Sequence, residues 1–202
     1  MKCIKLSLLL TIITLSSFTP PAGYQPGDKA KDFRLKNIDG KMYSLSQDKE
    51  AKGFIVIFTC NHCPFSVAYE DRILALDKKY KPLGYPVVAV NPNDEKIVPD
   101  DSFENMIKRA REKNFTFPYL QDATQYYARE YGAQRTPHVF VLQRNGKDLI
   151  VKYVGAIDNN TYNPDEVTER YVENAVNELI EGKPVSVPFT KAIGCTIKWK
   201  KS

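Results

Sequence analysis

Two cysteines three positions apart are the residues of this chain best suited to chemistry. Cys60 and Cys63 follow the apolar run 54–58 and precede a helical apolar pattern that includes Val67 and Ile73. An apolar run without alternation is typical of a strand buried on both faces. The pair is therefore expected where a central strand ends and a helix begins, which is the position of a redox-active dithiol.

The start of a helix favours a negative charge on the first of the two sulfurs. Free N–H groups and the positive end of the helix dipole stabilise an anion there, so we expect Cys60 to be held towards the thiolate and to act as the nucleophile. Cys63 lies one turn further on, where it can attack a mixed disulfide formed at Cys60 and act as the resolving thiol. His62, protonated or donating a hydrogen bond, would favour the Cys60 thiolate and make the couple more oxidising. The alternative for His62 is an exposed loop histidine without a role.

Other thiols and acids leave several interpretations open. The default for Cys195 is a buried apolar thiol in a C-terminal strand with Ile197 and Trp199, because it has no partner nearby in the sequence. The alternative is a third redox cysteine that folds back to the dithiol. Glu70, two turns beyond Cys63, is either a proton acceptor for the resolving thiol or a solvated helix carboxylate. The dithiol itself could be an inert disulfide or half of a zinc site, although zinc needs four ligands.

The first residues resemble a signal peptide. Within 1–22, Lys2 and Lys5 precede an apolar core at 6–15 that is too short to span a bilayer comfortably. We therefore expect a periplasmic or secreted protein, with membrane association if the segment is not cleaved. Cleavage would remove Cys3, one of the four cysteines. The odd number that is left does not suit a disulfide scaffold.

The remaining chain, 23–202, has the composition expected of a single domain, with a core at 26–190 and a C-terminal extension at 191–202. Of the 202 residues in the whole sequence, 43% are apolar and 26% are charged. The formal net charge of +5 becomes +3 (5 − 2) when Lys2 and Lys5 are removed. So mild a charge, without a basic stripe, argues against a nucleic-acid partner.

Turn signals and apolar periodicities predict the order of the elements. They are a hairpin around an Asp-Gly turn, the central strand, the dithiol helix, a second buried strand, a helical insertion, a second hairpin and a last helix, with limits near 33–45, 54–58, 64–83, 86–90, 101–131, 138–154 and 163–180. This order predicts an α/β fold, a three-layer sandwich with a mixed β-sheet, an N-terminal β-hairpin extension and a helical insertion.

With this order of elements, the chain resembles the thioredoxin-like redoxins of the alkyl hydroperoxide reductase/thiol-specific antioxidant (AhpC/TSA) group. The resemblance runs from about Gly27 to the C-terminus and rests on the N-terminal hairpin, Cys60–Phe65, Thr136-Pro137 and Gly194–Trp199. It implies a thioredoxin-like fold. It also implies a cis Thr136–Pro137 bond that faces the dithiol, with the Thr136 backbone free to pair with a client chain. An ordinary trans proline that opens a strand is the alternative.

The chain departs from the thioredoxin pattern around the dithiol. Thr59 stands where thioredoxins have Trp, Phe54 where they carry a buried Asp, and Asn61-His62 where they have Gly-Pro. The peroxiredoxin motif Pro-x-x-x-Thr-x-x-Cys does not occur either. Neither the reductase role of thioredoxins nor the peroxidase role of peroxiredoxins is therefore carried over directly.

The leading prediction is an exported thiol–disulfide oxidoreductase that exchanges disulfides with protein thiols. Cys60 and Cys63 would carry the reaction, and His62, Thr136 and Pro137 would assist it. The predicted reaction uses no cofactor and no metal. Its predicted partners are client proteins and a redox partner, without nucleic acid and without a stable membrane span.

Two rival functions use the same cysteines. In an antioxidant thiol peroxidase, Cys60 would be oxidised to a sulfenate and Cys63 would resolve it. In a copper-binding chaperone, Cys60, Cys63 and His138 would hold the metal, because thiolate and imidazole ligands suit copper. Peroxide consumption tests the first rival, and metal analysis of the purified protein tests the second.

Overall fold

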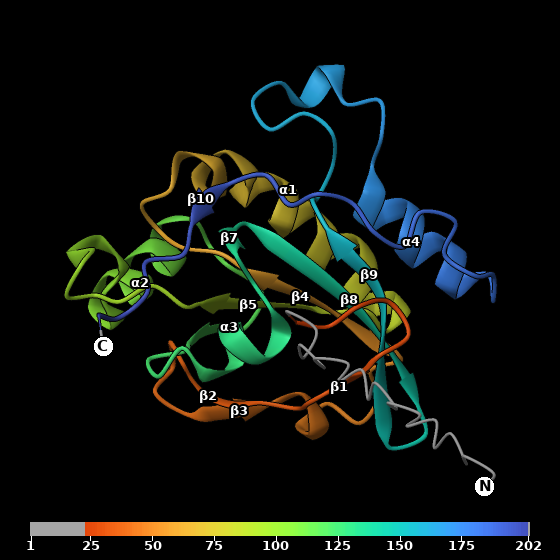
Figure 1. The fold of residues 1–202 in the computed structure, drawn as a ribbon, viewed down its shortest axis with the longest axis horizontal. Coiled ribbons are helices and arrows are strands. Elements are labelled where there is room, and N and C mark those ends of the chain that lie inside the picture. Colours follow the sequence, from red (N-terminus) through yellow and green to blue (C-terminus); the bar gives the residue numbers. More distant parts are fainter. Residues whose placement is uncertain (1–22, 202) are drawn as a thin grey trace, which may run out of the picture.

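The computed structural model describes residues 23–201, so the expected signal peptide, 1–22, lies outside the described residues. Within that range the centre of the molecule is an eight-stranded mixed sheet with the order β1-β9-β8-β4-β5-β6-β2-β3 (Figure 1). Its strands are β1 Lys29–Ala30, β2 Arg34–Asn37, β3 Met42–Ser44, β4 Gly53–Phe58, β5 Val87–Asn91, β6 Tyr119–Gln121, β8 His138–Asn145 and β9 Asp148–Gly155. A second ladder joins β7 Arg135–Thr136 to β10 Cys195–Thr196.

The predicted central strand is β4, and every one of its residues is buried. It runs parallel to β5 and antiparallel to β8. Neighbouring residues of β4 pack into different layers, since Ile55 and Ile57 belong to one apolar cluster and Phe54 and Val56 to another. Such a strand needs cover on both faces, which explains its unbroken apolar sequence.

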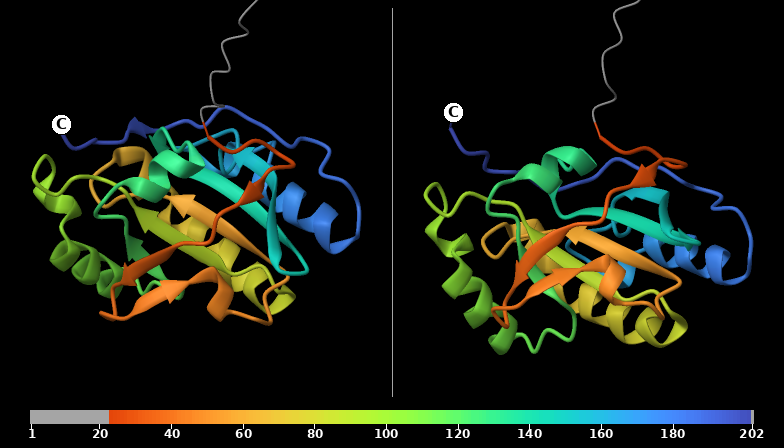
Figure 2. Two further views of the ribbon diagram at one scale, coloured as in Figure 1. Left: turned by 60° about the horizontal axis from the view of Figure 1, so that its bottom comes forward. Right: turned by 90° about the horizontal axis from the view of Figure 1, so that it is seen from below.

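Helices provide that cover. They are α1 Pro64–Tyr80, α2 Phe103–Glu112, α3 Tyr126–Tyr131 and α4 Tyr171–Ile180. Buried residues of α1, α2 and α4 share a cluster with Ile55, whereas buried residues of α3 pack with Phe54 on the opposite face. Figure 2 shows α3 on one side of the sheet and α1 and α4 on the other. The structure thus confirms the predicted α/β sandwich.

Two local predictions are confirmed by backbone geometry. The first hairpin, β2–β3, turns through Gly40, whose φ of 82° is natural for glycine. The helical insertion begins where its sequence indicated, because the Ser102 side chain accepts a hydrogen bond from the Asn105 N–H and caps α2.

The last helix begins later than predicted. Asn163 caps only a single 3-10 turn, 164–166, and α4 spans Tyr171–Ile180. The N–H groups of residues 168–169 donate to the Asn159 side chain instead of forming helical bonds. These hydrogen bonds to the Asn159 side chain keep the chain before α4 in a loop conformation, so the expected helix start at Asn163 is wrong.

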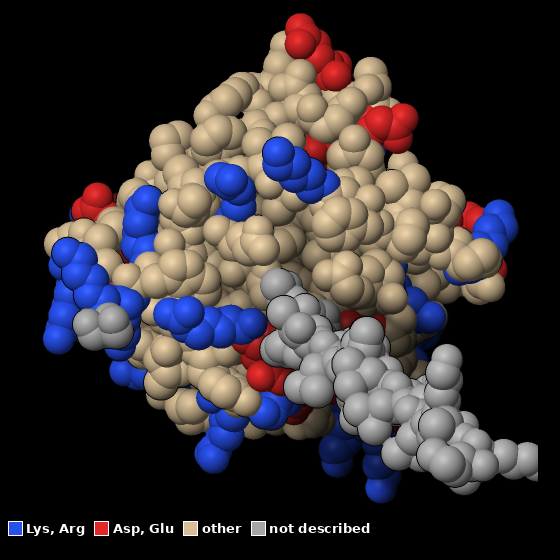
Figure 3. Space-filling view, in the orientation of Figure 1, with Lys and Arg blue, Asp and Glu red and all other residues tan. Residues whose placement is uncertain are grey.

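The surface fits the mild net charge. On the face shown in Figure 3, Lys and Arg side chains are spread over the surface and do not form a continuous stripe. Among residues 23–201, no helix combines the length and the apolar character that crossing a membrane requires.

Candidate active site

The two cysteines of the motif lie where the sequence placed them. Cys60 follows the end of β4, and Cys63 is the residue that precedes the first turn of α1. Pro64 occupies the first helical position, where its missing N–H costs no helical hydrogen bond. The strand therefore delivers both sulfurs to the N-terminal end of a long helix, where an anion is favoured.

Cys60 is a free thiol and only 3% exposed. Its sulfur lies 3.3 Å from the Thr136 hydroxyl oxygen, 3.7 Å from His62 Nδ1 and 3.8 Å from the Ser66 hydroxyl oxygen. Hydroxyl and imidazole groups that surround a sulfur in this way can donate to its anionic form. The site is therefore suited to holding a thiolate at Cys60.

Cys195 is not an unpartnered thiol. It forms a disulfide with Cys63, with a Cα–Cα distance of 6.1 Å. The default expectation, a buried thiol packed in an apolar strand, is therefore wrong. Sequence separation concealed the pairing, because the two residues are 132 positions apart and meet only when β10 reaches β7.

The predicted cis peptide bond between Thr136 and Pro137 is confirmed. The expectation that the Thr136 backbone would be free for a client is wrong, because Thr136 pairs with Cys195 of β10. The sulfur of Cys63 also lies 3.2 Å from the Thr136 carbonyl oxygen. A disulfide sulfur carries no proton, so this is a close contact and not a hydrogen bond.

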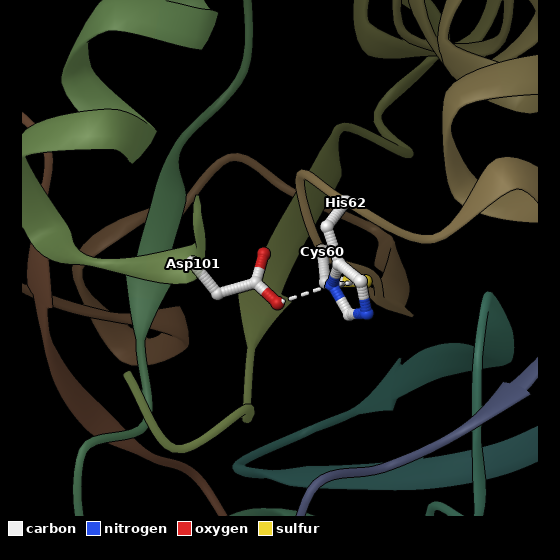
Figure 4. Close-up of side chains that lie close together, drawn as sticks. All are labelled: Cys60, His62 and Asp101. Atoms are coloured by element: carbon white, nitrogen blue, oxygen red, sulfur yellow. Dashed lines mark hydrogen bonds and ion pairs between the residues drawn. The ribbon is translucent and has the colours of Figure 1, made fainter. Parts of the chain in front are cut away.

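His62 lies beside Cys60 and is held by a residue that the sequence did not single out. The Asp101 carboxylate points toward the His62 ring (Figure 4), and 2.6 Å separates its Oδ2 from Nδ1. The hydrogen bond with Cys60 and the charges of Cys60 and Asp101 raise the pKa of His62 from 6.5 to about 9, against the opposing effect of burial. Cys60 and Asp101 thus favour the charged form of the imidazole. A role for His62 in supporting the Cys60 thiolate stays a prediction.

Asp101 is fully buried and held by several donors. Its carboxylate accepts from the Asn61 backbone N–H at 2.7 Å and from the Asn93 side-chain amide at 2.8 Å. The expected helical insertion begins at position 101, but Ser102 is the residue that caps α2. A helix start needs only one capping side chain, so the presence of a second polar residue, Asp101, beside Ser102 was the signal that Asp101 could have another role.

The other two candidate residues, Glu70 and His138, are buried and hydrogen-bonded to other parts of the protein. Glu70 is 5% exposed, and its carboxylate accepts two hydrogen bonds from Arg109 at 2.6 and 2.8 Å. It is thus not a solvated carboxylate, and Arg109 occupies both of its oxygens. Burial lowers the pKa of His138 to about 4, and its Nδ1 accepts from the Gln134 backbone N–H.

A metal could be held by one group of side chains in the described part of the chain. Donor atoms of Cys60, His62 and Asp101 lie within 4.8 Å of one another. The proposed copper ligands are a different set, and they are not assembled here, since Cys63 is bonded to Cys195. His138 is not a member of the group either.

Fold and site together define a thioredoxin-like protein, with cysteines between a central strand and a helix and a cis proline beside them. A model of the family described as Redoxin matches residues 25–175, which is most of the chain. The chain therefore belongs to the redoxin family, and it is an oxidoreductase. The resemblance to AhpC/TSA-type redoxins is confirmed.

Individual relatives agree with this assignment. The thiol-disulfide oxidoreductase ResA of Geobacillus thermodenitrificans (strain NG80-2) is 27% identical over 154 residues, covering 73% of this chain and 82% of that protein. The crystal structure of an uncharacterized conserved protein from Geobacillus kaustophilus has a TM-score of 0.81 and 38% identity, covering 88% of this chain and 93% of the other. A hypothetical protein from Sinorhizobium meliloti 1021 has a TM-score of 0.81 and 32% identity, covering 89% and 97%.

Proposed function

We propose that this chain is an exported thiol–disulfide oxidoreductase that exchanges disulfides with protein thiols, with Cys60 as the nucleophile. A signal peptide at 1–22 and one thioredoxin-like domain at 23–202 are part of the proposal. The observation that supports it most directly is the position of the Cys60 thiol beside a helix start and a histidine. Its free thiol stands before a helix, with the Nδ1 nitrogen of His62 3.7 Å from the sulfur.

In the first step, the Cys60 thiolate attacks one sulfur of a client disulfide. A bond forms between Cys60 and the client, the client S–S bond breaks, and the departing client thiolate takes a proton. The His62 imidazolium can supply that proton from Nε2, because its Nδ1 proton is held by Asp101. Asp101 acts as a positioning residue, because it holds the ring through Nδ1.

In the second step, a Cys63 thiolate attacks the Cys60 sulfur. The Cys60–Cys63 disulfide forms and the client leaves with its second thiol. This step requires a free Cys63 thiol, so a dithiol of the redox partner must first reduce the Cys63–Cys195 disulfide present here and is itself oxidised to a disulfide. The reverse sequence oxidises a client dithiol, so the same residues serve either direction of electron flow.

Thr136 and Pro137 help to position the reacting sulfur and the client chain. The Thr136 hydroxyl touches the Cys60 sulfur at 3.3 Å, and the β7 edge offers backbone groups for pairing with an extended chain. Because β10 occupies that edge, a client that uses it must displace β10. The relative ResA is a thiol-disulfide oxidoreductase, which supports the same reaction class.

The proposal is tested by trapping the first intermediate in cells. Cys63→Ser/Cys195→Ser removes both sulfurs that could resolve a mixed disulfide and leaves Cys60 in place. We expect this variant to accumulate covalent, reductant-sensitive adducts with other exported proteins, because no intramolecular thiol remains to release them. The matched control also replaces Cys60 by Ser and should form none.

A peroxidase would give a different result. If the trap variant forms no client adducts while the unmodified protein consumes peroxide rapidly with a thiol reductant, the Cys60 sulfur reacts with peroxide and not with protein disulfides. Fractionation of the same cells tests export, since an adduct with a cytoplasmic protein would contradict the signal peptide at 1–22.

A further inference from the structure

The C-terminal segment returns from α4 across the molecule (dark blue in Figure 1), and near its end the Lys198 carbonyl oxygen accepts a hydrogen bond from the Asp94 N–H. On the way, β10 pairs with β7 in antiparallel register, with Cys195 opposite Thr136. Addition of a strand to an open edge is a common way of binding an extended chain. The protein's own C-terminal segment therefore occupies the edge at which a client chain is expected.

Gly194 makes this close docking possible. A Cβ at this position would lie 2.3 Å from the Thr136 carbonyl oxygen, closer than any side chain tolerates. The Arg135 side chain in turn donates to the Gly194 carbonyl oxygen at 2.9 Å. Glycine is needed here because two backbones approach each other closely.

Residues beyond β10 hold the segment against the site. Ile197 is 3% exposed, and the Lys198 N–H donates to the Asn93 side-chain oxygen at 2.8 Å. The same Asn93 side chain donates to Asp101, the residue that holds His62. The segment is thus attached to the structure that supports the reactive cysteine, and not only through its disulfide.

Three sulfurs converge on one residue. Cys60 touches the hydroxyl of Thr136, Cys63 lies against its carbonyl oxygen, and Cys195 faces it across the ladder. Cys63 is bonded to Cys195, while Cys60, three positions away at the helix start, keeps a free thiol. A thiol beside a disulfide has the components of thiol–disulfide exchange.

We propose that the Cys63–Cys195 disulfide of the C-terminal segment is a substrate of Cys60 within the same molecule. Cys60 and Cys195 then compete to form a disulfide with Cys63. The inference rests on the proposed redox role of Cys60. The Cys60 thiolate attacks the Cys63 sulfur, the Cys60–Cys63 bond forms, and the Cys63–Cys195 bond breaks. Cys195 leaves as a thiolate and takes a proton from water. One disulfide and one thiol are present before and after, so the step consumes no oxidant or reductant.

The exchange gives the oxidised protein two forms with different surfaces. With Cys63 bonded to Cys195, the β7 edge is covered and Cys60 is a free thiol. With Cys63 bonded to Cys60, β10 is held by noncovalent contacts alone, and a client strand can compete for the edge. Cys195 therefore controls whether the edge is available to clients.

The test uses the purified full chain in glutathione buffers of several redox poises. Samples are quenched with acid, alkylated and digested, and mass spectrometry measures the amounts of the Cys60–Cys63 and Cys63–Cys195 pairs. We expect both pairs, in a ratio that is the same at every poise, because their interconversion transfers no net electrons. Cys195→Ser should contain only the first pair, and Cys60→Ser only the second.

The midpoint potential gives an independent measurement. If the Cys63–Cys195 form is favoured tenfold, removing it by Cys195→Ser destabilises the oxidised state about elevenfold and raises the potential by about 30 mV. A Cys60–Cys63 pair below about 1% of the oxidised unmodified protein would overturn the inference. Client adducts at Cys60 would still uphold the proposed function in that case. Two exchanging disulfides without client adducts would refute the function and leave the exchange standing.

Discussion

Replacing Asp101 by Asn should lower the pKa of His62 and weaken the support of the Cys60 thiolate. The substitution keeps the size of the side chain but removes a buried negative charge 2.6 Å from the ring. Cys60 and Asp101 together hold the pKa of His62 at about 9. Loss of one adjacent opposite charge lowers a pKa by about 1–3 units, so we expect a value of roughly 7 in the variant.

The size of the effect follows from the same pKa. The difference between 6.5 and about 9 corresponds to about 3 kcal/mol of preference for the protonated form. The His62 side chain is 23% exposed, so solvent screens the interaction and roughly half should appear as folding stability. Because folding raises this pKa, the contribution is fully present below pH ~6.5 and is lost as pH rises through about 9.

Nitrogen-detected NMR of the imidazole rings measures this directly, since the chain contains only two histidines. His138 serves as an internal control, because burial lowers its pKa to about 4 and Asp101 is not its partner. Cys60→Ser should lower the His62 pKa further than Asp101→Asn, since the hydrogen bond with Cys60 is the largest contribution. A His62 pKa near 6.5 in the unmodified protein, or one that Asp101→Asn does not move, would refute the assignment of these charges.

Gly194→Ala should dislodge β10, because the added Cβ would meet a backbone oxygen at 2.3 Å, and peptide mapping should then show more Cys60–Cys63 disulfide in the oxidised protein. Thr196→Ala, at an exposed position of the same strand, should leave the distribution unchanged, and equal behaviour of the two variants would contradict the role of the close approach. Burial also makes folded His138 titrate at about 4, so the free energy of unfolding should fall by up to about 3 kcal/mol as pH drops from ~6.5 to about 4. Urea titrations should show this loss, and His138→Gln should reduce it; an equal loss in that variant would assign it to other groups.

Features encoded over short stretches were predictable from the sequence. The apolar run of β4, the Asp-Gly turn after β2 and the Ser102 cap of α2 each depend on residues close together in the chain. The predicted strand end and helix start therefore placed Cys60 and Cys63 correctly. Family resemblance, not periodicity, supplied the cis bond before Pro137.

Features that depend on distant residues were missed. Asp101 reaches His62 from a turn about forty positions later, and no local pattern distinguishes a buried acceptor from a helix cap. Cys195 looked isolated because its partner becomes a neighbour only after β10 docks. The early start assigned to α4 failed for a similar reason, since the side chain of Asn159 binds backbone groups that a helix would have used.

The span of the Cys63–Cys195 bond has a consequence for chain entropy. This link closes a separation of 132 residues, whereas a Cys60–Cys63 link joins near neighbours. In an unfolded chain, the statistics of loop closure favour the short link by on the order of 3 kcal/mol. The native fold reverses that preference by fixing β10 beside β7. Oxidation of unfolded chains should thus produce mainly the neighbouring pair, and formation of the distant pair then follows the recovery of tertiary structure.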